Sequence, residues 1–199
     1  MTIIDNLAAD TYNINVKVDS ANAYWMHSNV DISVLNITVP TNDLRSNGAG
    51  WLPDSASSSG KAHFGFTVRP GNNNGAAPKG SSTFVFRGLD GFNYLVKGNS
   101  WQGGYLQFSA EPGTTIFTRS NFKGNCNVQK IDPATGLVVE SSGNYSFEAF
   151  TKDGDLLSPR AADAYSITVW DRNGAVWHKV GSAAALVSLG GGNITNKAK

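Results

Sequence analysis

Cysteine and histidine are scarce in this chain, and their scarcity excludes much metal and disulfide chemistry. The 199 residues include one cysteine, Cys126, and three histidines. A single cysteine cannot form a disulfide within the chain, and structural zinc sites of the four-cysteine or mixed cysteine and histidine kind need more ligands. We expect Cys126 to be a buried or half-buried, inert thiol, with a disulfide between two chains as the alternative.

Charge is also scarce, whichever its sign. The chain has sixteen Lys and Arg residues and fifteen Asp and Glu residues, so its net charge is +1, and charged residues form 16% of it. Soluble domains usually contain about 25%. This balance argues against a nucleic-acid-binding protein of the ordinary basic kind and against a polybasic membrane-surface protein.

Long apolar runs are absent as well. No stretch approaches the ~18 apolar residues of a membrane-spanning helix, so we expect no transmembrane segment. The first six residues, MTIIDN, contain neither the basic region nor the apolar region of a signal peptide. If the protein is exported, its signal is therefore not part of this sequence.

The residues that are plentiful indicate an all-β fold. Apolar and polar residues alternate in Tyr12–Val18, Ala62–Val68 and Tyr165–Val169, which is the period of a half-buried strand. Ten phenylalanines, six tyrosines and five tryptophans can supply a core. We predict an antiparallel β-sandwich of jelly-roll or Ig-like type, with a barrel as the alternative and less than about a tenth of the chain in helix.

Turn-forming residues separate the predicted strands. Pairs of asparagine or aspartate with glycine tolerate the positive φ of tight turns, and the chain has four that we expect to be turns: Asn47-Gly48, Asp90-Gly91, Asp153-Gly154 and Asn173-Gly174. Residues 55–60, 71–80 and 126–142 are expected to be loops. Residues 182–188 form the only candidate helix.

The chain is predicted to have two parts, an N-terminal strand-forming extension (residues 1–47) and a sandwich domain (48–199). In the extension, residues 30–39 are apolar on both sides and should be buried on both faces. The predicted strand Tyr12–Val18 alternates strictly between apolar and polar residues. It can either fold back onto its own sheet or pair with the sheet edge of a second copy of the chain. The candidate assembly residues are its apolar members: Tyr12, Ile14, Val16 and Val18.

A series of short motifs in a set order covers most of the chain. They are GWL (50–52), GKAHFGF (60–66), PKG (78–80), YLV (94–96), FKG (122–124), YSF (145–147), DGD (153–155), DAYSITVWD (163–171) and LGGGNI (189–194). Over about residues 50–196 the chain thereby resembles the post-COAP family of all-β domains of bacterial secreted and surface proteins. The resemblance implies an extracellular or cell-surface location and a non-catalytic accessory or structural role. Residues 1–47 and the long stretch 109–142 depart from it.

Catalytic machinery is not evident in the sequence. A hydrolase needs a nucleophile beside a base, and the histidines that fall in predicted strands, His63 and His178, are expected to be ordinary surface or edge residues. The Gly-x-Ser-x-Gly motif of a nucleophile elbow is absent. We therefore expect that the protein is not an enzyme.

Four aspartates form a candidate calcium site. Asp153, Asp155, Asp163 and Asp171 fall within nineteen residues, and calcium prefers carboxylate and carbonyl oxygens. The spacing is not that of an EF-hand. Weak binding of Ca²⁺ is the hypothesis, and an acidic turn in contact with water is the alternative. No other cofactor is expected.

Three tryptophans are candidates for ligand binding. Aromatic rings can stack on the faces of sugars, and Trp101, Trp170 and Trp177 are the candidates; packing in the core is the alternative for each. The functional hypothesis is a non-catalytic, extracellular structural or interaction domain that contacts other copies of itself, in a fibre for example, or other surface proteins. A carbohydrate-binding module that uses exposed tryptophans is the alternative.

Overall fold

The computed structural model describes residues 7–8, 11–16, 31–37, 44–71, 76–113 and 115–197. These residues form strands and one short 3-10 helix, Gly154–Leu156. The strands are β1 (Thr11–Val16), β2 (Asp31–Asn36), β3 (Arg45–Pro53), β4 (Lys61–Arg69), β5 (Lys79–Arg87), β6 (Asn93–Ser109), β7 (Arg119–Ile131), β8 (Val138–Lys152), β9 (Ala164–Trp170), β10 (Val176–Val180), β11 (Val187–Ser188) and β12 (Gly191–Lys197). No helix in this part of the chain is long and apolar enough to cross a membrane.

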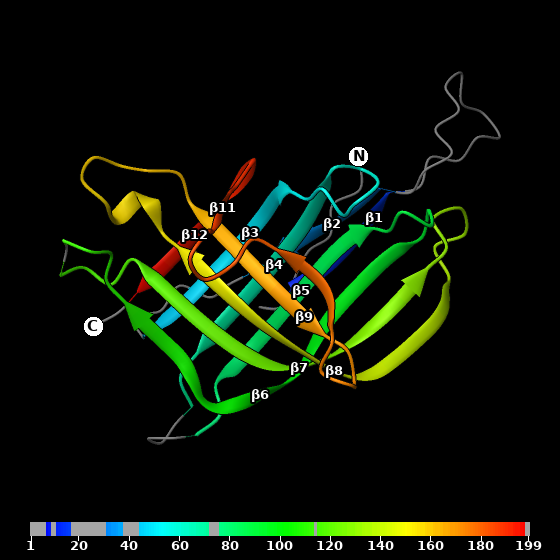
Figure 1. Cartoon of the computed structure of the whole chain (residues 1–199), viewed down its shortest axis with the longest axis horizontal. Coiled ribbons are helices and arrows are strands. Elements are labelled where there is room, and N and C mark those ends of the chain that lie inside the picture. The colour runs from blue at the N-terminus through cyan, green and yellow to red at the C-terminus, as the bar shows by residue number, and fades with distance from the viewer. Residues whose placement is uncertain are drawn as a thin grey trace.

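One large antiparallel sheet dominates the molecule. Its strand order is β10-β9-β8-β7-β6-β5-β4-β3-β12, and the short β11 pairs with β9 beside β10. Figure 1 shows that the sheet curls strongly, so that β9 crosses in front of β4 and β5. The sheet is therefore a half-barrel, and the predicted all-β antiparallel class is confirmed.

The core fills the inside of the curl. Phe64 of β4 and Tyr165 of β9 are fully buried, and their rings stack with centroids 4.3 Å apart. Phe66 lies against Phe122 of β7 at 4.9 Å. The alternation seen in the sequence of β4 places these phenylalanines on the inner face, so that the two halves of the sheet bury each other's apolar side chains.

A small second sheet covers part of the outer face. β1 pairs with β2 in a two-stranded antiparallel hairpin, and this hairpin packs on β4 and β5. Gly65 of β4 is needed there, because a side chain at this position would collide with Val34 and Thr11. Thr11 also hydrogen-bonds through its hydroxyl to Ser81 (2.9 Å). The first alternating strand thus pairs within its own chain; Val18, one of the candidate assembly residues, lies outside the described residues.

The hairpin buries only one of its faces. Thr11 and Val34 face the large sheet, whereas Ile14 and Leu35 are 38% and 37% exposed. The prediction that residues 30–39 are buried on both faces is therefore wrong for Leu35, because its side chain lies on the face of the hairpin that is turned away from the large sheet. The predicted boundary at residues 47 and 48 falls inside β3.

Three local predictions need correction. Asn47-Gly48 is not a turn but lies inside β3, where Gly48 lets Phe66 and Ile194 approach closely. Residues 126–142 are mostly strand, since β7 and β8 leave only 132–137 as a turn. The candidate helix at 182–188 is also wrong, since residues 183–185 form bends and β11 follows. So short a segment makes too few hydrogen bonds to offset the unfavourable free energy of helix nucleation. The turns at Asp90-Gly91 and Asn173-Gly174 are confirmed, with φ of 83° and 80° at the glycines.

Candidate functional site

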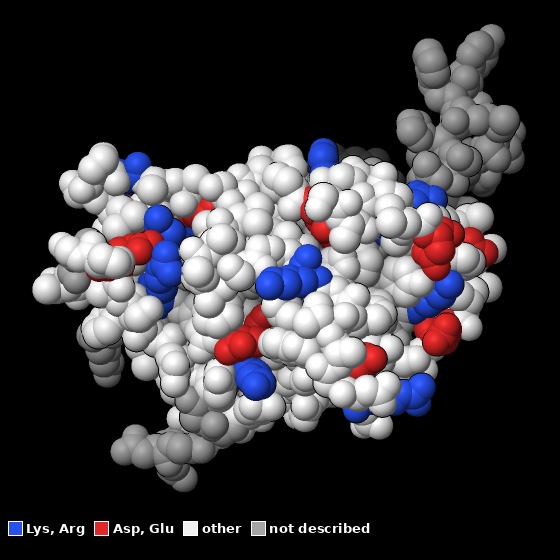
Figure 2. Space-filling model, in the orientation of Figure 1, with Lys and Arg blue, Asp and Glu red and all other residues white. Residues whose placement is uncertain are grey.

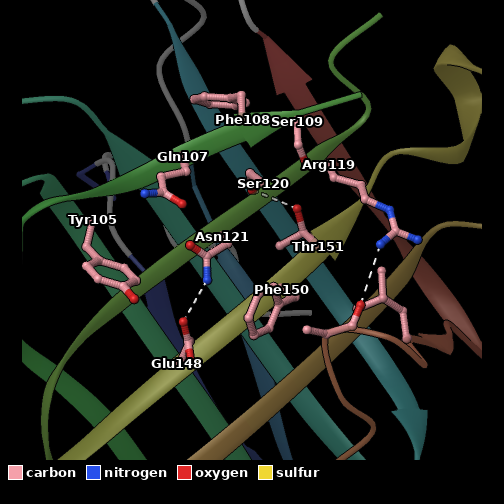
Figure 3. A pocket seen from close by; sticks show the side chains of 12 residues that line it. Tyr105, Gln107, Phe108, Ser109, Arg119, Ser120, Asn121, Glu148, Phe150 and Thr151 are labelled. Carbon is pink, nitrogen blue, oxygen red and sulfur yellow. Dashed lines mark hydrogen bonds between the residues drawn. The ribbon is translucent and has the colours of Figure 1, made fainter. Parts of the chain in front are cut away.

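A groove of about 350 Å³ crosses the outer face of β6, β7 and β8. Along these strands, Phe122 and Phe147 point into the core, so the alternate residues Asn121, Glu148 and Phe150 point outward. Tyr105 and Gln107 of β6 line the same groove, and Figure 3 shows how these side chains converge on it. The segment between β10 and β11 supplies Ala183 and Leu186 as a further wall.

The register of the strands places polar side chains opposite each other. Gln107, Asn121 and Phe150 form one row across β6, β7 and β8, and Lys123 and Glu148 are opposite each other in the next. Asn121 donates a hydrogen bond from Nδ2 to Oε1 of Glu148 at 2.9 Å. This bond orients both side chains in the middle of the groove (Figure 3).

One end of the groove carries a compact charge cluster. Glu111 lies 3.0 Å from Nε of Arg119 and 3.2 Å from Nζ of Lys152. Burial by itself would raise the pKa of Glu111, but hydrogen bonds from Arg119 and Lys152 outweigh burial and hold the pKa below its usual value. Charges elsewhere are sparse: Figure 2 shows small groups of basic and acidic side chains separated by wide uncharged areas.

Trp170 is the one predicted tryptophan that lies beside the groove. Lys123 connects it to the groove, since Nζ of Lys123 lies 5.4 Å from the ring centroid of Tyr105 and 5.9 Å from that of Trp170. These distances are in the range of cation–π contacts. Trp170 thus lies near Tyr105 but is not one of the residues that line the groove.

The other two predicted tryptophans are packed against the core. Trp101 donates from its indole nitrogen to the Gly80 carbonyl at 3.2 Å, and its ring lies edge-on to Phe122 at 5.9 Å. Trp177 lies edge-on to Tyr94 at 5.6 Å and to Tyr145 at 5.5 Å. The structure therefore does not bring the three tryptophans together.

The predicted calcium ligands have partners within the chain. Asp163 accepts hydrogen bonds from the backbone N–H of Gly154 (2.8 Å) and of Ile194 (2.6 Å). Asp153 is buried and accepts from the N–H of Asn196 at 2.8 Å. Both aspartates follow β8 and hold β12 through its backbone, so they join the free side of β12 to the rest of the fold.

The remaining two aspartates are used locally. Asp155 lies 3.8 Å from Arg160 on the surface, and Asp171 accepts from the N–H of Asn173 in the turn after β9. The described residues hold no group of three or more histidine, cysteine or acidic side chains placed to bind a metal ion. Calcium binding stays a prediction, and a melting temperature unchanged by millimolar Ca²⁺ after chelation would contradict it.

His178 differs from its prediction, whereas Cys126 agrees. His178 is only 6% exposed; it contacts Oδ2 of Asp54 through Nε2 at 3.1 Å and stacks on Phe86 at 3.8 Å. It is a core histidine because β10 lies across β5 rather than at a free surface. Cys126 is fully buried, and burial raises the pKa of its thiol to about 12.

Sequence reasoning did not identify Tyr105, Gln107, Asn121, Glu148 and Phe150 as binding residues. Comparison with known proteins adds nothing to their interpretation. No family model, curated protein or solved structure matches this chain. The resemblance to the post-COAP family accordingly stays a prediction from motifs.

Proposed function

We propose that this chain is a non-catalytic interaction domain of an extracellular or cell-surface protein, and that the groove on β6, β7 and β8 is its binding surface. The observation that carries the proposal is the groove itself, in which Asn121 and Glu148 are held in place by their mutual hydrogen bond. Its volume lies in the range of about 300–1,000 Å³ that is common for ligand sites. The extracellular setting is supported by the motif resemblance alone.

The lining of the groove favours binding over catalysis. It contains neither histidine nor cysteine, and the hydroxyl of Ser120 is bonded to Thr151 and Ser46 on the inner side. A nucleophile needs an adjacent base to be activated. Glu148, the one carboxylate of the lining, already accepts a hydrogen bond from Asn121.

The proposal is tested by filling the groove. Asn121→Trp places a large ring between β6 and β8, and the wild type and this variant are screened for binding to soluble polysaccharides and to a displayed peptide library. We expect a ligand for the wild type that the variant does not bind. Binding that survives Asn121→Trp, or turnover of ester or glycoside substrates, would contradict it.

Self-association is a second candidate function, and the exposed face of the β1–β2 hairpin supports it. Ile14 and Leu35 lie there as a diagonal pair on the same face of adjacent strands, since Ile14 is opposite Ser33 and Leu35 is opposite Tyr12, and both are more than a third exposed. Apolar residues exposed together on a sheet face favour contact with another protein surface. A second copy of the chain is the occupant that we propose, which agrees with the assembly hypothesis for Tyr12, Ile14 and Val16.

Sedimentation velocity of the full chain tests this candidate. Assembly should increase with concentration and disappear in the double variant Ile14→Asn with Leu35→Asn. Val176→Asn is the matched control, because Val176 is also exposed (58%) but lies on β10. A chain that stays monomeric at high concentration, or a control as defective as the double variant, would exclude assembly through this face.

A further inference from the structure

We propose that the groove on β6, β7 and β8 binds a neutral saccharide, an inference that rests on the proposed binding function. Saccharides present two kinds of surface, hydroxyl groups that both donate and accept hydrogen bonds and apolar C–H faces. A site for them therefore combines planar polar side chains with aromatic rings.

The polar part of the groove fits hydroxyl groups. The amides of Gln107 and Asn121 each carry a donor and an acceptor, and they lie next to each other in one row of the sheet. Because Asn121 uses Nδ2 to bind Oε1 of Glu148, its own Oδ1 and the Oε2 of Glu148 can accept from a ligand. Three neighbouring side chains thus present donors and acceptors together.

The apolar part of the groove lies on both sides of these polar groups. Figure 3 shows the ends of Asn121 and Glu148 between the rings of Tyr105 and Phe150. A ring-shaped ligand seated here would contact aromatic carbon at its edges or faces and polar atoms in the middle. The groove has the size of one bound sugar unit or a few.

The charges around the groove favour a neutral ligand. Arg119, which lines one end, has its Nε 3.0 Å from Glu111, and Lys123 and Glu148 are opposite each other in the strand register. Lys152 shares Glu111 with Arg119, so three basic groups stand against two acidic ones here. The net charge beside the groove is therefore small, which leaves little attraction for a phosphorylated or polyanionic ligand.

The floor of the groove disfavours a peptide. Peptides commonly bind by adding a strand to a free sheet edge. Here β7 is paired with β6 and β8 on its two sides, and the groove-lining part of β8 is paired with β7 and β9. The backbone of β7 and β8 is thus already paired, and over these strands only side chains are available for contact. The part of β6 that lines the groove pairs with β7 alone, but a strand added at that edge would lie beside the groove in the plane of the sheet and not in it.

Affinity gel electrophoresis of the full chain tests the inference. The gels contain a neutral β-glucan, a neutral galactomannan or acidic polygalacturonate, and a displayed peptide library is screened in parallel. We expect retardation by at least one neutral polysaccharide and none by polygalacturonate. Asn121→Ala should weaken binding about tenfold, which corresponds to the loss of one ligand hydrogen bond.

Asn125→Ala is the matched control. Asn125 lies on the same strand and the same face as Asn121 but bonds to Ser100 away from the groove, so its affinity should be unchanged. Gln107→Ala repeats the test if Asn121→Ala does not fold, as judged from its melting curve. Equal loss in Asn125→Ala, or full affinity in both groove variants, would overturn the assignment of the site.

The two proposals fail in distinguishable ways. Binding of polygalacturonate alone, or of a peptide alone, that is lost in Asn121→Trp would overturn the saccharide inference and leave the binding function intact. Failure of the wild type to bind any member of the panel would overturn both.

Discussion

Tyr165 is a polar residue that the fold buries completely although its hydroxyl lacks a hydrogen-bond partner among the described residues. Its ring is fully buried and stacks on Phe64, yet no described residue accepts or donates a hydrogen bond at its hydroxyl. Burial raises the pKa of this phenol far above its usual value. A buried hydroxyl without a partner loses its bonds to water on folding, and this loss destabilises the native state.

Tyr165→Phe should therefore keep or raise the free energy of unfolding, by about 1 kcal/mol. Tyr94→Phe is the contrasting variant, because the Tyr94 hydroxyl donates to Asp90 at 2.8 Å and its loss should lower stability. Urea unfolding of both variants and the wild type measures the difference. A clear loss of stability in Tyr165→Phe would mean that its hydroxyl has a partner in solution.

Asp153 should make stability depend on pH in a direction unusual for a carboxylate. Burial raises its pKa; the bond from the Asn196 N–H opposes this rise, and the nearby Asp163 adds to it. When the folded pKa exceeds the unfolded one, the folded state binds the proton more tightly, so the contribution to stability is full at low pH and is lost as pH rises through the folded pKa.

The variant Asp153→Asn removes this titration and keeps an acceptor for the Asn196 N–H. The stability of the wild type relative to Asp153→Asn should be greatest near about pH 3.5 and should decline toward about pH 7. Urea unfolding at several pH values measures it. A difference that grows with pH would show that the pKa is lowered in solution.

At the scale of elements, the carboxylate of Asp163 joins two distant parts of the sheet. Its two oxygens accept from Gly154, just after β8, and from Ile194 on β12. β12 pairs with β3 on one side only, so Asp163 and Asp153 satisfy backbone groups on its other side. This arrangement protects a sheet edge that would otherwise be free to pair with another chain.

Asp163→Asn should lower the free energy of unfolding by about 1–3 kcal/mol, because the new amide directs its N–H groups at a backbone donor. Asp155→Asn is the control. Asp155 is exposed and its ion pair with the exposed Arg160 is long at 3.8 Å, so this variant should change the free energy of unfolding by no more than about 0.5 kcal/mol. Denaturant unfolding measures both. Equal effects would mean that the bond to β12 contributes little.

The sequence predicts elements well where large apolar residues alternate without interruption, as in β4 and β9. The sequence does not predict β7 in the same way, because the alternation of apolar and polar residues is interrupted there. Gly124 stands at an inward position in place of a large apolar residue, since Phe147 and the Ser100 carbonyl occupy that space. The groove could not be found for a related reason. Asn121 and Glu148 meet only through the register of β7 and β8, which shifts at two irregular points, and local sequence does not encode that register.

For the whole molecule, the outer face of the curled sheet has two regions. The β1–β2 hairpin covers the part over β4 and β5. Its Val34 also packs against a cluster of Val85 on β5, Leu95 near the start of β6 and Ile131 at the end of β7. The groove occupies the part over β6 to β8. The groove and the area covered by the β1–β2 hairpin are thus separate parts of the outer face.

Deleting residues 1–19 should leave the large sheet folded, because β1 is not part of its strand order. The deletion removes the partner of β2 and uncovers apolar side chains, so the melting temperature should fall and binding of the dye ANS should rise. Circular dichroism and ANS fluorescence measure these effects. Loss of all β structure would show that the hairpin is required for the sheet to form.

The pairing of β12 with β3 sets a condition on how the chain can fold. It joins residues that are far apart in the sequence: Ser46 bonds to Asn196, 150 residues later. Contacts this distant in sequence form slowly, because a long loop must close before they stabilise anything. During synthesis, one side of β3 therefore stays unpaired until β12 has been made, and this interval is when binding of a chaperone would matter most to the yield of native protein.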